Sequence, residues 1–265
     1  MVLHSANFVY FSATKTTEKI IKNIAKGLKF EKHNFLDLTK ADNREQFLKL
    51  KKDELLVIAL PVYGGRVPNL LRKWMSNLEA DETPTVCISV YGDRDYGDHM
   101  IELKEMVKKQ GCRPFSHAAF IGEHSFLINR PTEYTSRPNA EDLEKAEQYG
   151  FNIKSELVLA KSIDDLTEKN VPGVIPSGEK KTLRDDFISV NPNCIGCGAC
   201  YKVCPVDAID KFRFDIVDRE KCIACCACIK ACNNKARGMK NPSTIYNYYE
   251  MAKDWLKEPK KIEIY

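Results

Sequence analysis

The chain has 265 residues, of which 43% are hydrophobic and 29% charged, and its formal net charge is +4. The length predicts two unequal domains, and the composition is ordinary for a globular protein. Lysine and arginine are spread along the chain, no apolar run approaches the ~20 residues that span a bilayer, and the N-terminus has no export signal, so we expect a cytoplasmic protein with no nucleic-acid partner and no membrane span.

Residues 1–163 alternate short apolar runs with segments of helical period, a pattern typical of an α/β fold with a parallel sheet covered by helices. The run LLVIAL is apolar at successive positions, as expected of a strand that is buried on both faces. We place strands at residues 6–11, 55–60, 85–91 and 115–121, and helices at 20–28, 70–78, 100–109 and 141–161, the last capped by Asn139.

The composition changes after residue 163. Residues 164–186 are charged, contain proline and glycine and lack periodicity, which indicates a linker. Residues 187–240 hold nine of the eleven cysteines and little apolar bulk, so a domain this small needs metal to stabilise it. Within residues 241–265, an amphipathic pattern over 243–257 predicts a helix that packs back on the first domain.

The cysteines repeat the motif C-x2-C-x2-C-x3-C. Thiols in a chain without an export signal favour metal ligation over disulfides. Zinc sites use pairs of ligands and do not call for a third cysteine three residues on, whereas this spacing caps a 4Fe-4S cubane, and the absence of histidine from the region excludes a Rieske centre. The first copy is Cys194, Cys197, Cys200 and Cys204, and the second is Cys222, Cys225, Cys228 and Cys232.

The region resembles a bacterial two-cluster ferredoxin, in which the fourth cysteine of each motif serves the other cluster. The resemblance implies one cluster on Cys194, Cys197, Cys200 and Cys232 and a second on Cys222, Cys225, Cys228 and Cys204. Cys226 interrupts the spacing, and we expect it to be a small side chain packed beside a cluster. Cys87 and Cys112, in apolar surroundings, are expected to be core thiols.

Three loops of the first domain are candidates for a ligand site. YFSATKTTEK places hydroxyls before a helix N-terminus, which suits an anion, although simple helix capping would use the same residues. PVYGGRVP and YGDRDYGD follow later strands and combine aromatic rings with glycine, which suits a planar ring system. Such loops meet at the carboxyl end of a parallel sheet, and no Walker lysine or G-x-G-x-x-G motif is present.

Together these loops resemble those of a flavodoxin, over about 160 residues, which implies a doubly wound five-stranded sheet that binds FMN. The phosphate would lie on Ser12, Thr14, Thr16 and Thr17. The flavin ring would lie between two sets, Pro61, Val62, Tyr63, Gly64 and Gly65 on one side and Tyr91, Gly92, Asp93, Tyr96, Gly97 and Asp98 on the other. Tyr63 or Tyr96 would stack on it. Ala13 and Lys15 replace glycines of the family, so either the loop is rearranged or Lys15 adds a charge to the phosphate.

The order of the two parts, the PVYGGRVP loop, the GEHSF stretch and both cysteine motifs resemble the flavodoxin-ferredoxin fusion family of anaerobes. The resemblance implies electron transfer between two 4Fe-4S clusters and FMN, with a redox protein or a small-molecule acceptor as partner. One alternative is a flavin-dependent reductase of a quinone or nitro compound, with Tyr63, Tyr96 and His124 around its pocket. The other is a cluster sensor without FMN. His99 and His124 are proton-donor candidates or, more simply, loop structure.

Overall fold

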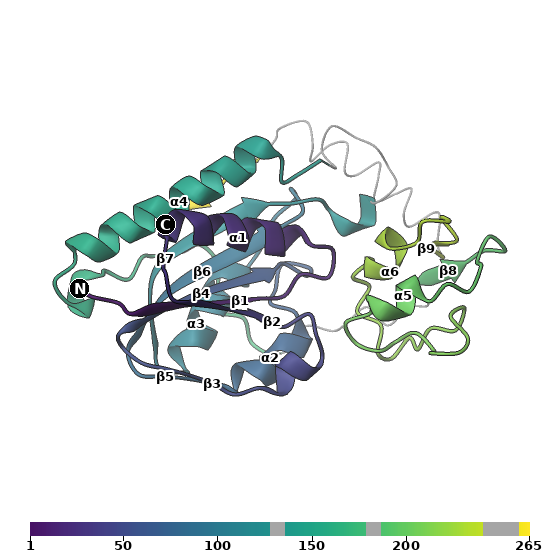
Figure 1. The fold of residues 1–265 in the computed structure, drawn as a ribbon, viewed down its shortest axis with the longest axis horizontal. Helices are drawn as coiled ribbons and strands as arrows, with labels where there is room; N and C mark the ends of the chain where they lie inside the picture. The colour runs from purple at the N-terminus through teal and green to yellow at the C-terminus, as the bar shows by residue number, and fades with distance from the viewer. Residues whose placement is uncertain (128–135, 179–186, 241–259) are drawn as a thin grey trace.

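The central sheet of the computed structural model (Figure 1) consists largely of strands that are buried on both faces. The structure describes residues 1–127, 136–178, 187–240 and 260–265. β4 reads ELLVIALP and is buried at six successive positions, and β6 is buried along its whole length. Strands with both faces buried require helices on both sides. The strands of this sheet are β1 (Ser5–Tyr10), β2 (His33–Asp37), β4 (Glu54–Pro61), β6 (Thr83–Tyr91), β7 (Cys112–Ile121) and β10 (Glu263–Ile264).

The strand order is β10-β7-β6-β4-β1-β2. The five strands other than β10 pair in parallel, and their chain order across the sheet is 2-1-3-4-5, the order of flavodoxin-like folds. The predicted fold class is therefore confirmed. β10 pairs antiparallel with β7 and adds a sixth strand that the sequence did not predict.

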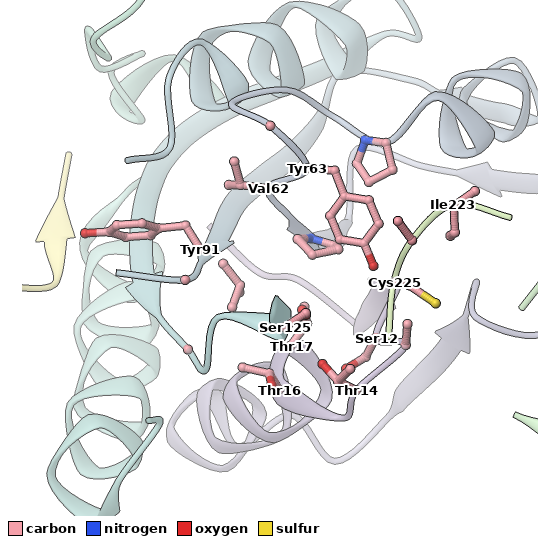
Figure 2. A pocket seen from close by; sticks show the side chains of 18 of the residues that line it. Ser12, Thr14, Thr16, Thr17, Val62, Tyr63, Tyr91, Ser125, Ile223 and Cys225 are labelled. Carbon is pink, nitrogen blue, oxygen red and sulfur yellow. The ribbon is translucent and has the colours of Figure 1, made fainter. Parts of the chain in front are cut away.

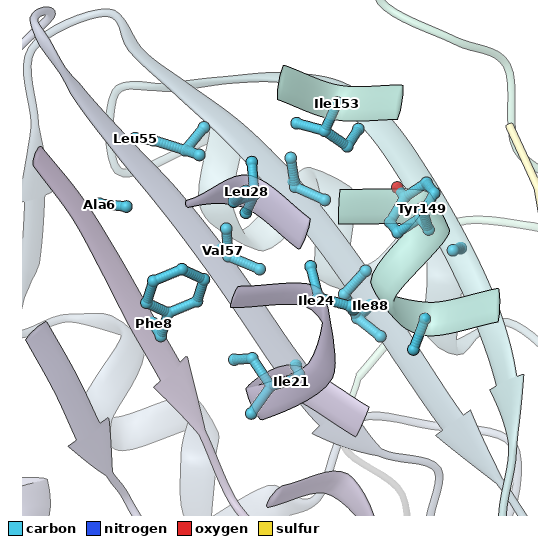
Figure 3. Packing of buried hydrophobic residues seen from close by; sticks show 14 of the residues in the cluster. Ala6, Phe8, Ile21, Ile24, Leu28, Leu55, Val57, Ile88, Tyr149 and Ile153 are labelled. Carbon is cyan, nitrogen blue, oxygen red and sulfur yellow. The ribbon is translucent and has the colours of Figure 1, made fainter. Parts of the chain in front are cut away.

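Helices cover the two faces of the sheet. α1 (Thr16–Leu28) and α4 (Ala140–Leu159) lie over one face, where Ile24 of α1 and Tyr149 of α4 pack against Val57 and Ile88 of the sheet (Figure 3). α2 (Asn69–Met75) and α3 (His99–Lys108) cover the other face, where Cys87 and Cys112 are buried as expected. Burying a valine or isoleucine side chain in such a layer stabilises the fold by about 1.5–3 kcal/mol.

α4 begins where the sequence predicted, whereas α2 ends at Met75 rather than at residue 78, because Leu78 pairs with Leu48 in a short strand. Asn139 caps α4, since its side chain accepts a hydrogen bond from the Asp142 N–H while the Asp142 carboxylate accepts one from the Asn139 N–H. The remaining elements of the first domain are short. They are the strands β3 (Leu48–Leu50) and β5 (Leu78–Ala80), which pair with each other, and the single turns η1 (Asp42–Glu45), η2 (Ser125–Leu127) and η3 (Ile163–Asp165).

Residues 187–240, the cysteine domain, are built from two similar halves. α5 (Ala199–Lys202) contains Cys200, the third cysteine of the first motif, and α6 (Ala227–Lys230) contains the equivalent Cys228 of the second. After each fourth cysteine, a backbone N–H donates to its Sγ at 3.3 Å, from Ala208 to Cys204 and from Ala236 to Cys232. The antiparallel pair β8 (Ile188–Val190) and β9 (Arg237–Met239) joins the two ends of the domain.

The C-terminal segment returns to the first domain, but through a strand. Residues 263–264 form β10, and Tyr265 exchanges backbone hydrogen bonds with His117 of β7. The helix expected over 243–257 lies outside the described residues. Within the described ranges, no helix combines the length and apolar character that crossing a membrane requires.

Candidate cofactor site

A cavity of about 400 Å³ lies at the carboxyl ends of the parallel strands (Figure 2). Ligand pockets usually measure about 300–1,000 Å³, so this one can hold a cofactor. Of the residues proposed from the sequence, eleven line it: Ser12, Thr14, Thr16, Thr17, Pro61, Val62, Tyr63, Gly64, Tyr91, Gly92 and His124. Lys15, Gly65, Asp93, Tyr96, Gly97 and Asp98 do not. The cavity is also lined by residues 122–126 after β7 and by Glu220, Lys221, Ile223, Ala224 and Cys225 of the cysteine domain.

The hydroxyl loop between β1 and α1 keeps a compact conformation without the family's glycines. Lys15 adopts a left-handed backbone conformation (φ 68°) immediately before α1. The loop therefore keeps the positive φ that a glycine would supply, and it is not rearranged. For a residue with Cβ this costs about 1–2 kcal/mol. The Lys15 ammonium pairs with Glu18 at 2.9 Å and lies outside the cavity, so its contribution here is the backbone turn.

Ser12 combines the two roles that the sequence left open. Its Oγ accepts a hydrogen bond from the Glu18 N–H at 3.0 Å, which caps the first turn of α1, and the residue also lines the cavity. Its backbone N–H donates to Thr39 Oγ1 at 2.7 Å. With Thr14, Thr16 and Thr17 beside it and the N-terminus of α1 directed at the loop, the site favours an anion.

The first aromatic loop is a tight turn that presents Tyr63 to the cavity. Tyr63 and Arg66 exchange backbone hydrogen bonds at 3.0 and 3.4 Å, and Gly64 and Gly65 both have positive φ, as a type I′ turn requires. The loop is anchored behind by Glu102 of α3, which accepts from the Val67 N–H at 2.8 Å and from the Arg66 guanidinium. The turn therefore places Tyr63 in the cavity wall.

The second aromatic loop turns mostly away from the cavity, which corrects the expectation for Tyr96. The Tyr96 hydroxyl donates to Glu263 of β10 at 2.7 Å, and the Asp93 carboxylate accepts from the Lys260 N–H at 3.2 Å. Gly97 lies against the backbone of Gly65, where a Cβ on Gly97 would come within 2.9 Å. Asp98 accepts from the Val174 N–H at 2.9 Å. These contacts hold the C-terminal strand and the chain after α4.

The two candidate histidines differ in position. His124 lines the cavity, its Nδ1 accepts from the Phe126 N–H at 3.3 Å, and burial, helped by the charge of Arg94, lowers its pKa to about 4. It is therefore a neutral ring at pH 7. His99 lies outside the cavity, fully buried, with Nδ1 2.8 Å from Ser89 Oγ, and burial lowers its pKa to about 4 as well. His99 is a core residue.

The second cysteine motif forms part of the cavity wall. Figure 2 shows Ile223 and Cys225 close to Tyr63. Burial raises the pKa of the Tyr63 hydroxyl well above its usual value, and the neighbouring thiols Cys225 and Cys226 add to that shift. Sequence reasoning did not find this wall, because no local pattern reports a contact between two domains.

The thiols of the second predicted ligand set lie near one another. Burial and the nearby thiols of Cys228, Cys204 and Cys222 raise the pKa of Cys225 to about 12, so Cys204 of the first motif lies close to thiols of the second. Among the residues that the structure describes, no three His, Cys, Asp or Glu side chains converge closely enough for one metal ion.

The first set faces outward. Cys194 and Cys197 are exposed, while Cys200 is buried. Cys226 is 1% exposed and lies in the small core of the cysteine domain, against which Phe126 of the first domain packs. Its backbone is left-handed (φ 61°) at the position equivalent to Gly198 (φ 72°) of the first motif.

Several contacts between described residues join the cysteine domain to the first domain. Lys230 pairs with Glu123, which lines the cavity. The Arg44 guanidinium donates to the Pro205 carbonyl. The rings of Phe126 and Phe187 lie 5.1 Å apart, and Ile223 packs against the core beside α2 and α3. The cavity wall from the cysteine domain is therefore held in place on both sides.

Comparison with known proteins agrees with this organisation. Residues 189–210, which contain the first motif, match the model of a 4Fe-4S binding domain. No curated protein matches the chain. Similar solved structures include a flavodoxin from the domain Archaea (12% identity, TM-score 0.41, 58% of this chain and 99% of that one) and the Streptococcus pneumonia TIGR4 flavodoxin (16%, 0.39, 57% and 99%). A flavone reductase is also similar (10%, 0.42, 62% and 66%).

At these TM-scores the likeness adds nothing to what the strand order shows by itself. The flavodoxin-like sheet and the matched 4Fe-4S segment in one chain are consistent with a flavodoxin-ferredoxin fusion.

Proposed function

We propose that this chain is an electron-transfer iron-sulfur flavoprotein that holds one FMN and two 4Fe-4S clusters. FMN would supply one- and two-electron chemistry and the clusters one-electron chemistry. The observation that carries the proposal is that Cys225, a ligand in the second motif, lines the same cavity as the hydroxyl loop and Tyr63. Free thiols at this density favour the reducing cytoplasm.

The residues of the cavity divide the binding of FMN between them. Ser12, Thr14, Thr16 and Thr17, at the N-terminus of α1, would hold the phosphate. Tyr63 would stack against the ring system, and the turn at Gly64 allows close approach of the backbone. Residues 220–225 would cover the ring from the cysteine domain and exclude water between the two centres.

The cluster on the first set of cysteines would exchange electrons with a redox partner. Cys194 and Cys197 are exposed, whereas the second set adjoins the cavity. The neighbouring Ile195, with 71% of its surface exposed, offers an apolar contact there. Partner, first cluster, second cluster and FMN would thus lie in sequence.

Anaerobic iron and flavin analysis of the reconstituted protein tests the proposal. We expect about eight irons and about one FMN per chain. Cys225→Ala should lose about four of the irons, and Cys226→Ala, as the matched control, should retain about eight. A wild-type protein with about four irons or fewer, or without FMN, would contradict the proposal.

Reduction of a small quinone or nitro compound is the second candidate. It is favoured by His124, a neutral ring in the cavity wall whose Nδ1 accepts from the backbone, which places its proton on Nε2. Steady turnover of a quinone that His124→Asn abolishes while FMN is retained would support it. Unchanged turnover in this variant would leave only the carrier function.

A further inference from the structure

Arg44 joins the hydroxyl loop of the cavity to the loop that carries a cluster ligand. It lies in η1, after β2, and its Nη1 donates to the carbonyls of Leu38 at 2.6 Å and Thr39 at 3.1 Å. Its Nη2 donates across the domain boundary to the carbonyl of Pro205, the residue after Cys204. The planar guanidinium can make these bonds at once because its donors form a rigid fork.

The other end of this connection reaches the anion site. Thr39, held through its carbonyl by Arg44, accepts the Ser12 N–H on its Oγ1 at 2.7 Å. The Arg44 backbone is itself fixed, because Asn77 Nδ2 donates to its carbonyl at 3.2 Å. Two residues therefore separate the Ser12 amide from the peptide that follows Cys204.

The guanidinium is half-buried, which strengthens its field on nearby groups. Burial lowers the pKa of the Arg44 guanidinium, and the nearby carboxylates of Asp207, Glu45 and Asp37 offset part of that shift. A cluster gains one negative charge on reduction, so a cation beside its remote ligand favours the reduced form.

We propose that Arg44 is a positioning residue that couples the hydroxyl loop to the segment after Cys204, and that its charge raises the reduction potential of the second cluster. The proposal deepens the proposed function and rests on it for the identity of the two cofactors. Arg44 does not line the cavity, and it would act through Thr39 and Pro205.

Two variants of the full-length protein separate position from charge. Arg44→Gln removes both the charge and the planar set of guanidinium donors, whereas Arg44→Lys keeps the charge but loses those donors. Arg213→Gln is the matched control, because Arg213 is exposed and pairs with Asp215 within the cysteine domain. Three quantities are measured anaerobically: cluster potentials by EPR-monitored titration, the FMN dissociation constant, and hydrogen exchange at Ser12 and residues 204–208.

In Arg44→Gln we expect a lower potential for the second cluster only, faster exchange at both segments, and an FMN dissociation constant raised about fivefold. Arg44→Lys should keep the potential near wild type but show the faster exchange, and Arg213→Gln should change none of these. If Arg44→Gln matches wild type and Arg213→Gln in potential and exchange, the proposal is refuted. If the wild-type protein binds no FMN or only one cluster, the proposed function fails, while exchange still tests the connection.

Discussion

Replacing Glu102 with glutamine should destabilise the first domain and loosen the loop that presents Tyr63. Glu102 is 4% exposed, and its Oε2 accepts from Arg66 Nε at 2.9 Å and the Val67 N–H at 2.8 Å. Its Oε1 accepts from Arg66 Nη2 at 2.7 Å and from Arg72. The variant would leave two half-buried guanidinium groups facing a neutral amide.

Breaking a buried ion pair by removing one partner costs about 3–5 kcal/mol. Glutamine keeps the volume and one acceptor, so we expect the low end, about 3 kcal/mol, or roughly a hundredfold in the folding equilibrium. The same change should weaken FMN binding, because Val67 lines the cavity and its amide loses a charged acceptor.

Urea unfolding followed by the fluorescence of Trp74, which is buried beside α3, measures the loss. Trp255 lies outside the described residues, and replacing it with phenylalanine in all proteins removes its signal. Glu79→Gln is the control, because Glu79 forms an exposed pair with Lys49 and should change stability little. A loss for Glu102→Gln no larger than that of the control would refute this reasoning.

The pH dependence gives an independent check. Burial opposes ionisation of Glu102, but hydrogen bonds from Arg66 and Val67 and the charges of Arg72 and Arg66 outweigh it, so its pKa is lowered in the folded protein. A lowered pKa means that the carboxylate contributes stability above its unfolded pKa of about 4.3, and loses it as pH falls through the folded value. The stability difference between wild type and Glu102→Gln should be constant near neutral pH and shrink below about pH 4.

Three further predictions concern single positions. Lys15→Gly should be more stable than Lys15→Ala by about 1 kcal/mol in urea unfolding, because glycine adopts the left-handed turn without strain. Cys204→Ala should lose about four irons and leave an EPR signal that matches Cys225→Ala rather than Cys194→Ala, because Cys204 lies with the second motif. Cys226→Gly should retain about eight irons but exchange backbone hydrogens faster at Phe126, which packs on the core that contains Cys226.

Strands with both faces buried could be predicted from the sequence, and the edge strands could not. β4 contains a continuous apolar run and β6 is buried at every position, because helices cover both faces. β2 lies at an edge, reads HNFLD and is largely exposed. It therefore has neither a continuous apolar run nor an alternation of apolar and polar residues. β10 has two residues and depends on pairing with β7 across the length of the chain, which no local signal reports.

The same division applies to the site. The 4Fe-4S character of the first motif could be predicted because cubane geometry sets a local spacing. The cavity wall formed by Ile223 and Cys225 and the link through Arg44 arise from domain packing, and neither leaves a pattern in the sequence. Tyr96 shows the reverse case, since an aromatic residue beside glycine suggested a flavin contact but binds the C-terminal strand through Glu263.

The two halves of the cysteine domain have similar backbone conformations but different surroundings. That difference sets the direction of electron transfer expected between the two proposed clusters. Both motifs use left-handed residues at equivalent positions, yet Cys194 and Cys197 are exposed whereas Cys225 adjoins the cavity. Burial disfavours the extra negative charge of a reduced cluster, and the nearby charge of Arg44 favours it. In Arg44→Gln the charge is lost while burial remains, so the second cluster should become harder to reduce than in the wild-type protein and transfer toward the flavin should slow. The reduction potential of the second cluster, compared between the wild-type protein and this variant, therefore measures how much the charge of Arg44 counteracts the effect of burial.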